Sequence, residues 1–107
     1  MQKHYKYILV DRQPVPVDDV TEWARWVETA DRTVARTEIG EITISTVFLG
    51  LDFSFGFGQL RLFETMVFGG RMNEEMERYA TWEEAETGHM LMVQRVIDGL
   101  MKESDNG

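Results

Sequence analysis

The stretch that decides the fold is residues 33–50, which read TVARTEIGEITISTVFLG. From Ile42 to Phe48 every second residue lies on one face of a strand, and this face is more apolar than the other. The Ile39-Gly40 pair, followed by Glu41, favours a chain reversal just before that strand. The stretch therefore predicts a β-hairpin over residues 33–50.

Further strands are predicted on both sides of this hairpin. Residues 5–10 are aromatic and β-branched, which is typical of a strand. Pro14 and Pro16 then favour an edge strand or an extended connector, because proline has no N–H to donate. Residues 60–68 predict another strand, and residues 76–80 predict a short final one.

Two helices are predicted from their capping residues and apolar spacing. Asp18 is expected to cap the first helix, whose apolar residues recur between Val20 and Ala30 and which should end near residue 31. Thr81 and Glu84 match the capping box Thr-x-x-Glu, which predicts the start of the last helix. We expect residues 102–107 to form a frayed tail.

The order of these elements determines the expected fold class. The 107 residues suffice for one small domain, spanning 1–107, with no second core. Strands joined by short links pair antiparallel, and amphipathic helices need a sheet face to cover. We therefore expect an α+β two-layer sandwich with an antiparallel sheet of about four to five strands and two helices on one face.

The amino-acid composition argues against several classes of function. Nineteen acidic residues against eleven basic ones give a net charge of −8, which argues against direct binding of nucleic acid. The absence of cysteine excludes thiol catalysis, disulfides and cysteine-based zinc sites. We expect no cofactor.

The sequence also bears on membranes and targeting. The short apolar stretch near the start lacks the length and the cleavage site of a secretory signal. The longest uncharged stretch lies between Glu41 and Asp52, about half of the roughly 20 residues needed to cross a bilayer. A soluble, cytoplasmic protein without membrane contact is expected.

An aromatic loop is the first candidate site. Residues 52–59 alternate phenylalanine with small residues, and their two glycines favour a loop. The phenylalanines either pack under the edge of the sheet or provide anchors for a partner protein. The G-x-G within the loop leads into a strand and not a helix, so a phosphate-binding loop is not implied. The three phenylalanines are Phe53, Phe55 and Phe57.

Six glutamates around the start of the last helix form the second candidate. Arg78 is the only basic residue among them. They indicate a cation site, a docking face for a basic partner, or a solvated helix start, where the helix dipole favours acids. These residues are Glu74, Glu75, Glu77, Glu83, Glu84 and Glu86.

His89 is the remaining candidate, since it lies on the apolar stripe of the last helix. One interpretation is a general base or metal ligand acting with Glu86 and Glu64, assisted by Tyr79 and Asp52. The other, which we favour, is a core histidine with one hydrogen-bond partner, because a metal site requires three or four convergent ligands.

Three motifs, TVFLGLD at 46–52, LFETMVFGG at 62–70 and YATWEEAETGH at 79–89, resemble a family of small uncharacterised proteins of bacteriophage and bacterial genomes. In that family a histidine commonly follows the Leu-Asp pair, and two prolines precede the Leu-Phe-Glu-Thr strand. Here Phe53 and Gln59-Leu60 stand in those places. The resemblance implies a phage or mobile-element setting, and no activity.

These observations predict a small acidic protein-binding module without catalytic residues. The most specific version of this hypothesis is a phage-encoded inhibitor of a host defence or nucleic-acid-handling complex. The basic surface of that complex would bind carboxylates in place of phosphates. A self-assembling structural or accessory phage protein, a homo-oligomer, is the alternative. A metal-assisted enzyme is the third.

Overall fold

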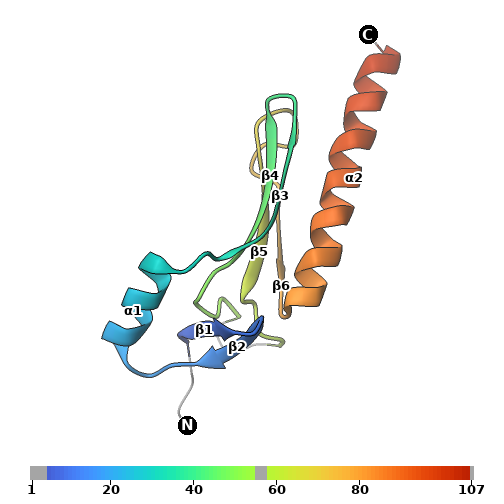
Figure 1. Cartoon of the computed structure of the whole chain (residues 1–107). Helices are drawn as coiled ribbons and strands as arrows, with labels where there is room; N and C mark the ends of the chain where they lie inside the picture. Colours follow the sequence, from blue (N-terminus) through green and yellow to red (C-terminus); the bar gives the residue numbers. More distant parts are fainter. Residues whose placement is uncertain (1–4, 55–57, 107) are drawn as a thin grey trace.

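The computed structural model describes residues 5–54 and 58–106 and has the expected α+β architecture (Figure 1). A four-stranded antiparallel sheet and a separate two-stranded sheet are combined with two helices. The elements, in chain order, are β1 (Tyr7–Val10), β2 (Gln13–Pro16), α1 (Val20–Thr29), β3 (Thr33–Ile39), β4 (Ile42–Phe48), β5 (Phe63–Phe68), β6 (Met76–Tyr79) and α2 (Trp82–Asn106).

The larger sheet is a meander in the order β3-β4-β5-β6. The predicted hairpin is present: Ile39 pairs with Ile42 across a two-residue connection. Gly40 adopts a φ of +59° there, a left-handed conformation that glycine accepts without steric cost. Strands β5 and β6 complete the sheet and confirm the two strands predicted from residues 60–68 and 76–80.

Helix α2 packs against all four strands of this sheet. The side chains of β4 and β5 alternate, so Ile44, Phe48, Phe63 and Val67 are buried on the helix side. The predicted capping box is present. The hydroxyl of Thr81 accepts from Glu84 N at 3.1 Å, and the Glu84 carboxylate accepts from Ala80 N at 3.1 Å. Helix α2 continues to Asn106, so it includes most of the residues expected to form the tail.

Strands β1 and β2 form their own hairpin beside the end of the meander. Tyr7 N donates to Gly50 O, and Asp52 N donates to Tyr5 O, both at 2.8 Å, so the N-terminal strand is fastened to the chain that leaves β4. Pro14 and Pro16 lie in β2, which pairs with β1 alone. This is the edge position that proline tolerates.

Helix α1 differs from its prediction in two respects. Its N-cap is Asp19 and not Asp18: the Asp19 carboxylate accepts from Thr21 N at 2.9 Å and from Glu22 N at 3.1 Å. Its apolar stripe is only partly buried, and Val20 is 61% exposed. The helix reaches the core mainly through Trp26, whose ring meets Phe48 edge-on at 5.7 Å.

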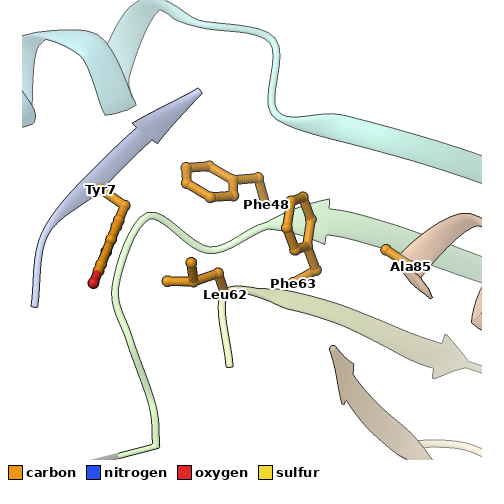
Figure 2. Packing of buried hydrophobic residues seen from close by; sticks show 5 residues of the cluster. All are labelled: Tyr7, Phe48, Leu62, Phe63 and Ala85. Atoms are coloured by element: carbon orange, nitrogen blue, oxygen red, sulfur yellow. The ribbon is translucent and has the colours of Figure 1, made fainter. Parts of the chain in front are cut away.

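The buried apolar residues form two clusters, which divide the core lengthwise. The aromatic cluster lies where α2 begins, and Figure 2 shows its residues on β1, β4, β5, the chain just before β5, and α2: Tyr7, Phe48, Leu62, Phe63 and Ala85. The aliphatic cluster lies further along α2: Ile44, Val67, Met92 and Val96.

None of the described helices is long and apolar enough to span a membrane.

Candidate functional site

The aromatic loop is fastened at its base by Asp52. One carboxylate oxygen of this buried residue accepts from Ser54 N at 2.9 Å and from Arg61 N at 3.1 Å, and the other accepts from the Ser54 hydroxyl at 2.8 Å. Phe53 N donates to Arg61 O at 3.2 Å. The two ends of the loop are therefore held together.

These hydrogen bonds also determine the ionisation of Asp52. Burial disfavours the charged carboxylate, but the bonds from Ser54 and Arg61 outweigh it, and the pKa of Asp52 is lowered. A lowered pKa in the folded state adds stability above the ordinary carboxyl pKa, and this stability is lost as the pH falls. The loop base is thus strongest when Asp52 is ionised.

Of the three predicted phenylalanines, Phe53 lies within the described part of the chain, whereas Phe55 and Phe57 lie outside the described residues. Phe53 is half-buried, and the Arg78 guanidinium stacks 4.5 Å from the centre of its ring. Arg78 also donates to Glu64 at 3.0 Å. The first phenylalanine thus packs on the end of β6.

The six glutamates are adjacent in sequence but occupy two places in the structure. Glu74 and Glu75 belong to the turn that leads into β6, whereas Glu83, Glu84 and Glu86 lie on the first turns of α2. Arg95, which contacts Glu75, is twelve helix residues after Glu83, a distance of about 18 Å along the axis. Glu77 lies within β6 and, like Glu75, faces Arg95, so it belongs to the first group.

The two groups also differ in their pairing. Arg95 donates to Glu75 at 3.1 Å and lies 4.0 Å from Glu77, so a cation lies close to both carboxylates. Within the described residues, no ion pair forms at Glu83 or Glu86, and both side chains are exposed. Of the six glutamates, those at the start of α2 are therefore exposed and free of ion pairs in the described structure, as is Glu74 in the turn before β6.

His89 belongs to a chain of buried and partly buried hydroxyl groups between the two core clusters. Its Nε2 lies 2.8 Å from the Thr37 hydroxyl, and its Nδ1 lies 2.7 Å from the Thr46 hydroxyl. Thr46 in turn bonds Thr65, and Thr65 bonds Tyr79. The single partner expected for this histidine is corrected to two, on β3 and β4.

Burial shifts the pKa of both titratable groups in this chain, His89 and Tyr79. Desolvation lowers the pKa of His89, because the protonated ring would be a charge in an apolar interior. Desolvation also raises the pKa of Tyr79, against the opposing effect of its bond to Thr65. Both groups are therefore held in their neutral forms.

The residues predicted for an enzyme are only partly brought together. His89 and Tyr79 are linked through the threonines, but Glu64 pairs with Arg78 and Asp52 holds the loop base. Glu86 is exposed on α2. Across residues 5–54 and 58–106, no three histidine or carboxylate side chains gather as metal ligands would.

Sequence reasoning missed a groove between β6 and α2. Its walls include Tyr79 of β6 and Leu91 of α2, and Leu91 is 62% exposed. Two signals were available in the sequence: Leu91 lies off the predicted apolar stripe, and Gly88 is a glycine inside a helix, where glycine is unfavourable.

Comparisons of the chain with protein-family models, with curated proteins and with solved structures found no match.

Proposed function

We propose that this chain is a small protein-binding module that meets its partner with the end of the molecule where α2 begins. The observation that carries the proposal is the unequal pairing of the acidic side chains. Glu83 and Glu86 are exposed without an ion pair in the described structure, whereas Glu75 and Glu77 lie beside Arg95. A group of exposed carboxylates attracts a basic partner protein and orients it as the two proteins approach.

The base of the aromatic loop contacts β6, the strand that leads into the start of α2, and this contact supports the same proposal. Arg78, which stacks on Phe53, precedes Glu83 by five residues, across the turn from β6 to α2. Anchors that combine aromatic and charged groups are typical of protein interfaces. The partner surface would therefore be basic and would also carry apolar side chains.

The phage setting implied by the family resemblance gives the proposal a more specific form. The module would act in the cytoplasm as an inhibitor of a host defence or nucleic-acid-handling complex. Such a complex has a basic channel for phosphates, and the net charge of −8 gives this chain the same sign as the phosphates it would displace. The proposal assigns no reaction to the chain.

The test compares two variants with the same change in net charge. Glu83→Lys with Glu86→Lys reverses the charge at the start of α2, whereas Glu28→Lys with Glu41→Lys reverses two exposed glutamates on α1 and on the β3–β4 turn. Glu84 is left unchanged because it caps Ala80 N. Tagged protein is incubated with bacterial lysate at low salt and washed in salt steps, and retained proteins are identified by mass spectrometry.

We expect one stoichiometric partner that is released as the salt rises. The first variant should reduce its retention about tenfold, a change of about 1.4 kcal/mol, and the second should leave it near wild type. Equal retention by both variants would contradict the proposed surface.

Self-association is the second candidate, favoured by the face of the sheet opposite α2. Phe68 and Met76 on that face are 48% and 39% exposed, respectively. Exposed apolar side chains on a bare sheet face are a typical contact between copies. This candidate would be favoured by a molar mass that rises with protein concentration in light scattering, together with a lysate experiment in which no partner protein is retained.

A further inference from the structure

Strand β6 leaves one edge of the larger sheet unpaired in the part of the chain that the structure describes, since its ladder is with β5 alone. Val67 N donates to Glu75 O at 3.0 Å. The alternation of an antiparallel ladder therefore turns the main-chain groups of Glu77 toward β5, and those of Met76 and Arg78 away from it. Outward N–H and C=O groups are a template for an added strand.

Helix α2 lies beside β6 (Figure 1). Side chains of this helix form one wall of the groove. Two neighbouring hollows of about 220 and 350 Å³ share Tyr79, Gly88 and Leu91 in their lining, and together they are called the groove here. A Cβ at Gly88 would overlap the ring of Tyr79. The glycine thus lets the tyrosine ring pack directly against the helix backbone, with the side chain of Leu91 beside it.

The charges along the groove have one predominant sign. Glu77, Glu83 and Glu84 border it, against a single base, Arg95. Arg95 already donates to Glu75 at 3.1 Å. The groove is therefore lined by three carboxylates and one guanidinium that already has a carboxylate partner. This excess of negative charge favours a ligand with lysine or arginine side chains.

We propose that this groove binds an extended segment of the partner protein, which adds to β6 as a fifth, terminal strand. Successive side chains of a strand point to opposite faces, so every second residue of the segment would face α2. An apolar side chain would contact Leu91 and Tyr79, and flanking lysine or arginine side chains would reach Glu83 and Glu84. This inference rests on the proposed function and specifies the form of its partner.

The test begins with a random peptide library selected on the immobilised full chain, and the selected peptides serve as probes. We expect peptides in which lysine or arginine alternates with apolar residues. Leu91→Asp places a charge in the groove, whereas Met90→Asp places one at the neighbouring helix position, which is 66% exposed and does not border the groove. The first variant should weaken peptide binding about tenfold or more, and the second should leave it near wild type.

Hydrogen exchange separates strand addition from simple charge attraction. On binding, the amides of Met76 and Arg78 should become protected by about tenfold or more, because they gain hydrogen bonds to the peptide main chain. Met76→Pro removes one outward N–H at the first position of an edge strand, where proline is tolerated, and should weaken binding while the fold is retained.

The outcomes distinguish this inference from the proposed function. Basic peptides that bind Leu91→Asp as well as wild type, without protection at Met76 and Arg78, would overturn strand addition and leave a charge-driven binding module. Protection of these two amides by peptides that lack lysine and arginine would support strand addition and overturn the basic partner. If no selected peptide depends on Leu91 for binding, the groove is not the peptide-binding site.

Discussion

At the start of α2 the helix meets the sheet through stacked aromatic rings, whereas further along it meets the sheet through aliphatic side chains beside a cavity. In the aromatic cluster, Phe63 lies 5.2 Å from Phe48 and 6.2 Å from Trp82, measured between ring centres. Beyond the aliphatic cluster, a cavity of about 300 Å³ lies between the sheet and the last turns of the helix, bordered by Ile42, Val67 and Leu100. One end of the same layer is closely packed and the other is loose.

The difference shows which part of α2 holds the helix in place. The loose end is closed by an exposed ion pair between Arg71 and Glu103, 3.5 Å apart, and such pairs contribute at most about 1 kcal/mol. The packed end carries the capping box, the aromatic rings and the groove beside β6. The proposed binding surface therefore begins on the better-anchored half of the helix, at Glu83 and Glu84, and extends to Arg95.

Gly88 gives the largest expected effect, because it lies in the packed half. A Cβ there would overlap the Tyr79 ring. Gly88→Ala should lower the free energy of unfolding by about 3 kcal/mol, since overpacking outweighs the gain in helix propensity. Urea denaturation of the variant measures this. A variant as stable as wild type would show that the tyrosine ring moves aside freely and that this half is not closely packed.

His89 tests the polar layer that separates the two halves. His89→Leu removes the partner of Thr37 and one partner of Thr46, and should lower the free energy of unfolding by about 2 kcal/mol at pH 7.5.

The pH dependence of the same variant provides its control. Burial lowers the pKa of His89 below its ordinary value of 6.5, so below that pH the unfolded chain takes up a proton that the folded chain resists. Wild-type stability should fall between pH 7.5 and pH 5, and His89→Leu should lose less stability over this interval. Equal losses in the two proteins would contradict the buried, neutral histidine.

Gly99 gives the smallest expected effect, and one of opposite sign, in the loose half. No atom lies within 4 Å of a Cβ built at this position, in the same helix as Gly88. Gly99→Ala should therefore raise the free energy of unfolding by about 1 kcal/mol, through helix propensity alone. The same urea measurement applies. Destabilisation by this variant would mean that the cavity end is as closely packed as the other.

Much of the fold follows from local sequence signals. The alternation from Ile42 to Phe48, the reversal at Gly40 and the capping box at Thr81 predicted elements that the structure contains. These signals are reliable because each depends on residues within a few positions of one another. The choice between Asp18 and Asp19 as N-cap could not be read from the sequence, because either carboxylate can accept from the free N–H groups of the first turn.

Tertiary structure alone decided how the candidate residues are grouped. The six glutamates look like one patch in the sequence, but Arg95, about 18 Å along α2 from Glu83, pairs with only one of the two groups. His89 read as a core residue with one partner, but β3 and β4 each supply a threonine. The groove beside β6 forms only after folding, because the free edge of β6 and the helix α2 then come together. Gly88 of the helix packs against Tyr79 of the strand.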